Sequence, residues 1–518
     1  MRHKTGNDSL SAGIPSNLFF HLSLFKTTIS DSRTKMLYMN TRTAKIISVN
    51  VIALLLVFNS ATLKAQKTWT LQECIEHALK NNITVKQSEI SSEVSGVNYM
   101  QSKAAMLPSI NTSGSYSYNF GRSVDPFTND FTNSEIQSAN MSLNGNITIF
   151  NGFQIMNTLA QSKYDFYAGK ENLAKIKNDI ALNVAASYLQ VLYARESLKA
   201  SRDRLNSATE SRNRTKIMVD AGSMALGNLL DAEAAMAAEE LAVVNAENAL
   251  NTASISLMQL LELKQADGFA VADPVAELPE QSALAMKAED IYNTSVKILP
   301  EFRIAEYNLK SAEKGLMIAK GGRYPRLSMF GSLSSGYSNA RTRIKGSPVF
   351  LGYFPTGSIT SAGDDVLSPS FDYNSEKVPF SDQWDENYNK SVGLSLSIPI
   401  FNGWATESAI KRAKYNLENI KYNEQLTQNQ VYKSVVQAHA DAVAAQKKYY
   451  AAEKATNANK EAFSYAEKKY NVGMMSSIEF LNVRNNNAKA ESDFLQAKYD
   501  LIFRIKVLDF YLGKPLSF

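Results

Sequence analysis

The sequence predicts a mainly α-helical protein with a small β part, and two features of the residue pattern predict this fold class. The first is a pair of long stretches without helix breakers. Residues 153–220 hold one glycine and no proline, and residues 404–471 hold neither. Because an α-helix rises about 1.5 Å per residue, each stretch predicts a helix of roughly 95 Å. The second feature is a set of four short segments in which apolar and polar residues alternate.

Each long helix is expected to turn back on itself at a glycine. Gly222 and Gly473 end the two stretches, and a second helical run follows each of them. The predicted helical hairpins span 153–263 and 404–512. Their surfaces are polar over much of their length, so each hairpin needs neighbours on both sides rather than a core of its own. The shorter helices expected before the strands cover 70–106 and 286–320.

The alternating segments are expected to form two strand pairs, 109–120 with 139–150 and 326–337 with 390–401. In the first segment, Ile110, Tyr116 and Tyr118 fall on one face, and Ser and Asn residues fall on the other. Nearly uncharged segments with one apolar face and one Ser/Asn/Gly face are typical of lipid-facing β-barrel strands around a wet lumen. The alternative is a soluble sheet with one buried face.

Four strands do not close a barrel, and open strand edges are not tolerated in hydrocarbon. The chain is therefore expected to oligomerise if the sheet lies in a membrane. Small barrels begin at about eight strands, so a dimer and a trimer both satisfy this requirement.

The chain contains an internal two-fold repeat. Ile149-Phe150-Asn151-Gly152 returns as Ile400-Phe401-Asn402-Gly403, at an offset of 251 residues that holds for more than 100 residues. Upstream, Leu107-Pro108 matches Tyr324-Pro325 at an offset of 217. The predicted units are a first repeat over 66–273 and a second over 274–518. The second has 34 extra residues, in an aromatic-rich connection over 338–388 that suits either a plug or a surface contact.

The N-terminus resembles a secretory signal. Arg42 and Lys45 precede an apolar run of about 13 residues, which is short for a membrane-spanning helix. We therefore expect residues 1–65 to be a signal peptide, with Met36 or Met39 as alternative starts. The other interpretation is a single membrane anchor.

Composition argues against several function classes. The formal net charge of +5 depends on residues 1–65, because the remainder holds 47 basic and 48 acidic residues, so we expect no nucleic acid as partner. Cys74 is the single cysteine, and the chain has no nucleotide-binding or hydrolase motif. We expect no enzyme activity, no cofactor and no bound metal.

The ordered motifs resemble the TolC family of outer-membrane efflux proteins. They are the segment 69–82, the Leu-Pro and Tyr-Pro strand entries, the Phe-Asn-Gly exits at 150–152 and 401–403, and the turns at Gly222 and Gly473. The resemblance implies a homotrimer with a 12-stranded β-barrel among outer-membrane lipids and a trimeric α-barrel in the periplasm. It also implies that a periplasmic adaptor and an inner-membrane pump, of RND or ABC type, meet the hairpin tips, here Gly222, Ser223, Met224 and Gly473.

The same resemblance implies a gate near the second tip. Tyr470 stands where the family pattern has its tyrosine, and Glu479 stands where it has its first acid. Met475 replaces the expected arginine and Asn482 replaces the second acid, so hydrogen-bonded closure is incomplete. Steric closure by Met474 and Met475 is the alternative. In the first hairpin, the corresponding positions are Asn228 and Asp231.

A trimer would bring three copies each of Glu479 and Asp231 near one axis, which attracts cations electrostatically. The alternative is that both acids simply favour a helix N-terminus. For the whole chain we expect an export channel that carries substrates from the periplasm to the outside. The alternative function is a non-transporting secreted helical shaft with a structural or adhesive role.

Overall fold

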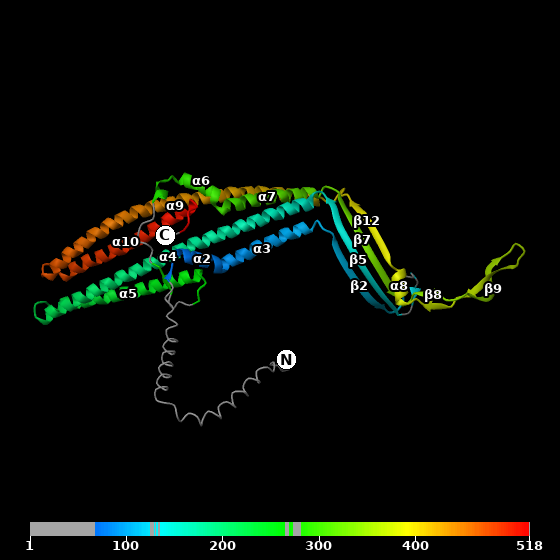
Figure 1. The fold of residues 1–518 in the computed structure, drawn as a ribbon, viewed down its shortest axis with the longest axis horizontal. Coiled ribbons are helices and arrows are strands. Elements are labelled where there is room, and N and C mark those ends of the chain that lie inside the picture. Colours follow the sequence, from blue (N-terminus) through cyan, green and yellow to red (C-terminus); the bar gives the residue numbers. More distant parts are fainter. Residues whose placement is uncertain are drawn as a thin grey trace, which may run out of the picture. The chain divides into compact units, whose positions relative to one another are not determined.

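The computed structural model describes residues 68–124, 129, 131–132, 135–264, 269–272 and 281–516. The predicted signal peptide over 1–65 lies outside these residues, as do residues 273–280, where the predicted second repeat begins. The described part of the chain is mostly helical, with one four-stranded sheet (Figure 1). None of its helices is both long enough and apolar enough to cross a membrane.

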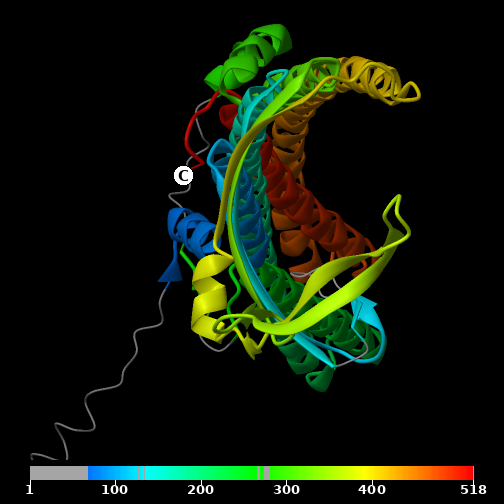
Figure 2. The same ribbon diagram turned by 90° about the vertical axis from the view of Figure 1, so that its right-hand side faces the viewer.

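The sheet joins strands from the two halves of the chain. Its antiparallel order is β12-β7-β5-β2, so the central pair β5–β7 combines one strand of each half. The strands are β2 (Ser109–Asn119), β5 (Ile136–Asn151), β7 (Arg326–Ser338) and β12 (Asn389–Ser397). They curve together as one sheet (Figure 2). Within the described residues, the outer edges of β2 and β12 have no strand partner.

The fourth strand is shorter than the sequence predicts. The expected strand 390–401 ends at Ser397, whereas its counterpart β5 pairs as far as Asn151. Pro399 explains the early end, because proline has no N–H to donate to a β-ladder. Residues 398–404 instead form an irregular connection to the following helix.

The two long hairpins have equal dimensions. Helices α4 (Gln154–Asp220) and α9 (Ala405–Asn471) each contain 67 residues. Helices α5 (Leu226–Leu260) and α10 (Ser477–Tyr511) each contain 35 residues. The bounds of the second hairpin follow those of the first by 251 residues, which is the offset of the sequence repeat.

The expected helices 70–106 and 286–320 are each divided in two. The first gives α2 (Leu71–Asn81) and α3 (Ile83–Ala104), and the second gives α6 (Ala288–Ile298) and α7 (Pro300–Gly321). Asn82 caps α3 through a bond from the Thr84 amide of 2.9 Å, and Pro300 suits the first position of α7. Next to the sheet, α3, α4, α7 and α9 pack side by side in that order.

The largest apolar cluster lies halfway along α4, where α2 and α5 pack against it. A short parallel pair of strands, β1 (Thr68–Trp69) and β6 (Ala270–Val271), closes over this cluster. The Tyr188 hydroxyl lies 2.9 Å from the Ala272 carbonyl and 3.2 Å from the Trp69 carbonyl. Tyr188 thus bonds both to the first described strand and to the residue that follows β6, at the two ends of the first half of the chain. A second cluster joins α6, α9 and α10 in the same way.

The connection 338–388 folds into a two-stranded arm with a base held by ion pairs. Its elements are β8 (Thr342–Ile344), β9 (Val349–Ile359), β10 (Asp365–Asp372), β11 (Ser375–Lys377) and α8 (Phe380–Glu386). At its base, the Arg343 guanidinium contacts Glu376 at 3.0 Å and Asp382 at 2.9 Å. The β9–β10 ribbon above this base exposes most of its aromatic side chains. The remaining short elements are β3 (Ser123–Val124), β4 (Phe131–Thr132) and the 3₁₀ turn Ser282–Ala285.

Replacing Gln383 should loosen the base of this arm. The buried Gln383 amide accepts a bond from the Ser338 N–H at 2.9 Å and donates to the Ser338 and Val378 carbonyls at 2.8 and 2.9 Å. Gln383→Ala removes these three bonds from the base of the arm and should cost about 2–4 kcal/mol locally. Faster proteolysis within 338–388 would report this loss. The exposed neighbour Asp385→Ala is the control, and equal proteolysis rates for the two variants would contradict the prediction.

Candidate functional site

Both hairpins turn through the same backbone motif at their tips. Gly222 and Gly473 have positive φ angles of 74° and 75°. In the first hairpin, the N–H groups of Gly222 and Ser223 donate to carbonyls three and five residues earlier, each at 2.9 Å. The N–H groups of Gly473 and Met474 repeat the pattern at 3.0 and 2.9 Å. This arrangement is the Schellman motif, which needs a left-handed residue after the helix and therefore favours glycine.

The tips expose a small set of side chains. Ser223 is exposed, and its hydroxyl donates to the Met218 carbonyl at 2.8 Å. Met224 is half-buried, and Met474 has 77% of its surface exposed. Of the two methionines expected to close the tunnel sterically, only Met474 projects away from its own hairpin.

The predicted gate residue Tyr470 packs inside the second hairpin. Its side chain is 8% exposed, and its ring stacks on Phe480 with the centroids 4.6 Å apart and the planes 10° apart. Phe463 and Met475 pack against the same pair. In this arrangement, Tyr470 and Met475 hold α9 against α10.

The two predicted acids have different local roles. Glu479 forms a capping box with Ser476: its carboxylate accepts from the Ser476 N–H at 3.1 Å and from the hydroxyl at 3.0 Å. These backbone and side-chain bonds lower the pKa of the exposed Glu479 carboxyl. Asp231 lies in the second turn of α5, beyond the helix start. The helix-terminus interpretation therefore fits Glu479 and not Asp231.

The structure brings predicted residues of the two hairpins together at one place. Asp231 and Tyr470 line one small cavity between the hairpins, together with Arg484. Glu479, Asn482 and Asn228 do not line this cavity. Asn482 is exposed, and Asn228 is half-buried with its backbone N–H bonded to the Ala225 carbonyl at 3.0 Å.

A charge cluster that the sequence does not predict joins the hairpins beside this cavity. Arg204 of α4 contacts Glu239 of α5 at 3.3 Å, and Arg484 of α10 approaches the other Glu239 oxygen at 3.8 Å. All three side chains are largely buried. Burial lowers the pKa of Arg484, Glu239 opposes this shift, and Arg204 adds to it. Within the described residues, Nε of Arg484 has no hydrogen-bond acceptor.

One signal in the sequence could have found this cluster. Glu239 lies in helical register with Ala235 and Ala246, which are buried. An acid on the buried stripe of a helix requires a cationic partner. The partners themselves could not be identified, because Arg204 and Arg484 resemble the many other charges on these helices. They also lie on separate elements of the chain.

Comparison with known proteins identifies the family of this fold. Residues 74–262 and 296–514 match the family described as outer membrane efflux protein. The chain belongs to this family. The outer membrane efflux protein BepC of Brucella suis biovar 1 (strain 1330) is 22% identical over 451 residues, which is 87% of this chain and 86% of BepC.

Solved outer-membrane channels share the fold of this efflux protein. The Campylobacter jejuni CmeC channel superposes with a TM-score of 0.69 at 18% identity, covering 86% of this chain and 85% of CmeC. The open-state MtrE channel of Neisseria gonorrhoeae gives a TM-score of 0.66 at 18% identity, covering 86% and 89%. The predicted TolC-family membership is confirmed, and the protein is an export channel protein of the outer membrane. The secreted-shaft alternative is set aside.

Neutralising Glu239 should destabilise the contact between the hairpins. Glu239→Gln leaves two arginines facing each other in a largely buried place, which should cost on the order of 3–5 kcal/mol. Chemical unfolding of the detergent-purified protein, followed by helical circular dichroism, would measure the loss. Removing one cation as well, in Glu239→Gln/Arg484→Met, should recover part of it. The exposed neighbour Glu240→Gln is the control, and equal stability of the two single variants would contradict the prediction.

The first turn of α10 should lose protection in acid. Because the pKa of Glu479 is lowered in the fold, its stabilisation is present above the ordinary glutamate pKa and is lost as pH falls through the lower folded pKa. Amide hydrogen exchange between pH 6 and 3, corrected for intrinsic rates, would show this change. The first turn of α5 has no acid and serves as the internal control. In Glu479→Gln, which keeps the capping geometry, the pH dependence should disappear.

Proposed function

We propose that three copies of this chain form one export duct, in which the four-stranded sheets close into a 12-stranded β-barrel. The observation that carries the proposal is the pair of unpaired sheet edges, β2 and β12, in the described part of the chain. Backbone groups at such edges have no water to bond in hydrocarbon, so edge must meet edge around a closed ring. Twelve strands from three copies suit the family fold.

The two faces of the sheet support a membrane position. On β12, Val392, Leu394 and Leu396 lie exposed on one face, as lipid-facing side chains would. The other face carries serine pairs across neighbouring strands. The hydroxyl pairs are Ser113–Ser142 at 2.9 Å, Ser117–Ser138 at 2.8 Å and Ser332–Ser391 at 2.8 Å. A hydroxyl-lined face suits a water-filled lumen.

In the proposed duct, the hairpins continue the barrel as a trimeric α-barrel in the periplasm. The equal helix lengths and the 251-residue shift support two repeated units, 66–273 and 274–518. The long polar hairpins have exposed outer surfaces, as expected of walls that pack against further copies. Cargo passes along the duct without chemical change.

The tips are the proposed docking points for a periplasmic adaptor, beneath which an inner-membrane pump of RND or ABC type delivers the substrate. Gly222, Ser223, Met224 and Gly473 form the two turns at the far end of the hairpins. Their exposed and rigidly capped geometry supports this role. A docking partner that contacts both turns of one copy would act on the relative position of the two hairpins.

The proposed closed state depends on the ion cluster rather than on a hydrogen bond from Tyr470. Arg484 links the second hairpin to Glu239 of the first, in a place where water screens the charges weakly. Asp231 and Tyr470 line the cavity beside it, so a shift of α10 would change the surroundings of both. Met474, Asn228 and Asn482 are proposed to line the tunnel near the tips.

Matched lysine substitutions on β12 test the barrel. Leu394→Lys places a charge toward lipid and should cost about 2–4 kcal/mol, whereas Ser395→Lys places it toward the lumen. We expect the first variant to lose heat-sensitive, detergent-extracted trimers from outer-membrane fractions. The second should keep the trimers and alter conductance in planar bilayers. A water-soluble monomer, or equal tolerance of both lysines, would overturn the proposed function.

Ion selectivity tests the proposed acidic ring at the tunnel end. Three copies each of Glu479 and Asp231 would favour cations. Reversal potentials in a salt gradient should show cation preference, and this preference should weaken in Glu479→Gln/Asp231→Asn. Asp385→Asn, which lies far away on α8, is the control. Unchanged ion selectivity in the double variant would show that neither acid lines the tunnel.

A further inference from the structure

Two junctions in the chain share one local structure. Each connects a strand to a long helix through Phe-Asn-Gly and a further aromatic residue: β5 leads to α4 through Phe153, and β12 leads to α9 through Trp404. Phe153 and Trp404 have nearly equal positive φ angles of 62° and 63°. The preceding glycines, Gly152 and Gly403, have φ angles of 65° and 61°. The repeat therefore extends to backbone conformation at this point.

The first junction is covered within the chain. Gly152 is buried, and a Cβ atom built on it would lie 2.3 Å from the Gly321 carbonyl oxygen and 2.8 Å from Cβ of Tyr324. The side chain of Gln154, just beyond it, donates to the Ile318 carbonyl at 3.0 Å. The end of α7 and the start of β7 thus close over this junction so tightly that only glycine fits.

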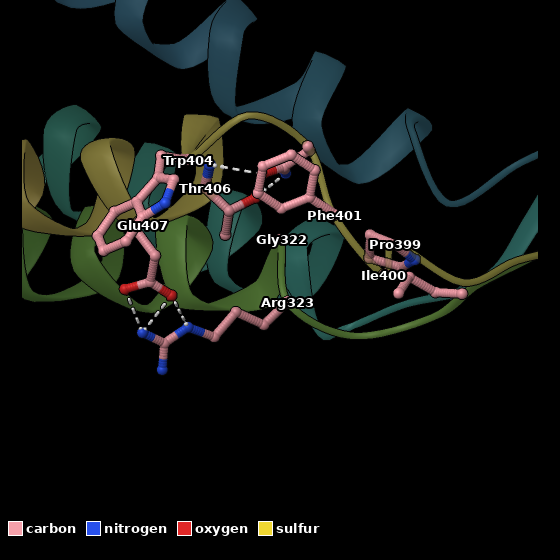
Figure 3. A pocket seen from close by; sticks show the side chains of 9 residues that line it. Gly322, Arg323, Pro399, Ile400, Phe401, Trp404, Thr406 and Glu407 are labelled. Atoms are coloured by element: carbon pink, nitrogen blue, oxygen red, sulfur yellow. Dashed lines mark hydrogen bonds and ion pairs between the residues drawn. The ribbon is translucent and has the colours of Figure 1, made fainter.

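The second junction is open. A Cβ atom built on Gly403 meets no heavy atom within 4 Å in the described part of the chain. Ile400 is 95% exposed and Phe401 is 80% exposed. The resulting cleft has a volume of about 270 Å³. Its lining includes Arg323, which donates to the two carboxylate oxygens of Glu407 at 2.8 and 2.6 Å (Figure 3).

A second segment of the chain is equivalent to the one that packs over the first junction, but it is exposed. Gly321 and Tyr324 cover the first junction, and the 217-residue offset places Tyr324 opposite Leu107. Leu107, in the connection from α3 to β2, and Ile110, near the start of β2, are each 67% exposed. The open junction follows β12 and the exposed segment precedes β2. These strands are opposite edges of one sheet, so the two features cannot meet within a single copy.

We propose that the Gly403 junction of each copy packs against the α3–β2 connection of the next copy, with Leu107 taking the place that Tyr324 has at the first junction. The occupant of the cleft is therefore a second copy of this chain. This inference rests on the proposed ring assembly and adds a contact at the boundary between sheet and helices.

The neighbouring helices support the same partner. Inside the chain, α4 and α7 pack with Tyr164 and Tyr307 stacked at 6.4 Å. The equivalent residues are Tyr415 of α9, at the 251-residue offset from Tyr164, and Ile90 of α3, at the 217-residue offset from Tyr307. Both side chains are well exposed, and in the ring Tyr415 would face Ile90 of the next copy. Exposed apolar residues continue as a stripe along α3 at helical spacing. The stripe consists of Ile83, Ile90, Val94 and Val97.

The sheet supplies an independent marker of the same assembly. In the β5–β7 pair, Asn146 lies opposite Phe330. The 251-residue offset takes Asn146 to Ser397, and the 217-residue offset takes Phe330 to Ser113. In the ring, Ser397 of one copy would therefore lie opposite Ser113 of the next. A disulfide between Ser397→Cys and Ser113→Cys therefore reports the ring, whereas one between Tyr415→Cys and Ile90→Cys reports the helix packing beside the junction and leaves Gly403 unchanged. Both are made in a Cys74→Ala background and tested as the full chain in outer membranes.

A matched pair of glycine variants tests the packing without any disulfide. Gly403→Asn and Gly222→Asn both place a side chain at a positive φ angle with no atom within 4 Å in the described chain. Asparagine tolerates that conformation, so each copy should still fold. Gly403→Asn should lower the dissociation temperature of the oligomer by roughly 5–10 °C relative to Gly222→Asn.

The outcomes separate the two proposals. Both disulfides together with the Gly403-specific loss support the junction contact. The Ser113–Ser397 disulfide alone, with equal dissociation temperatures for the two asparagine variants, overturns the junction contact and leaves the ring intact. Absence of both disulfides in folded protein overturns the ring and the junction together.

Discussion

The requirement that every backbone hydrogen-bonding group be satisfied in hydrocarbon governs this molecule. A sheet of four strands satisfies its inner ladders, and the outer edges of β2 and β12 have no strand partner in the described part of the chain. The position of the edges follows from the repeat, because each half contributes a strand pair and the pairs meet at β5–β7. In the proposed duct, assembly would follow from this topology, and the pairing of the sheets would determine which hairpins are neighbours.

The two ends of the hairpins are held by different physical interactions. Near the sheet, the backbone packs closely, as at Gly152, where no side chain fits. Near the tips, a largely buried cluster of two arginines and one glutamate connects the hairpins. The close packing at Gly152 allows one arrangement. In the charge cluster, two arginines share one glutamate, so either arginine can pair with Glu239. The sheet end is therefore suited to permanence and the tip end to movement.

Much of the fold could be predicted from the sequence, because it is encoded locally. Proline-free stretches predict the hairpins, period-two alternation predicts the strands, and Gly222 and Gly473 mark the turns. Features that depend on distant residues could not be predicted. Tyr470 lines a cavity with Asp231 of the other hairpin, which no local pattern indicates. Arg204 and Arg484 gave no local signal, since their partner becomes known only when three helices are placed together.

The β5–β7 pair also determines the order in which the chain can fold. Its partners, such as Ser138 with Ser338, are separated by about 180 to 200 residues along the chain. The first hairpin and the β2–β5 pair involve nearby residues, so they can form while the second half is still being made. The sheet is completed only after the second half arrives. Until then the first half has two unpaired strand edges. The risk of aggregation is therefore greatest while the chain is in the periplasm with its sheet incomplete.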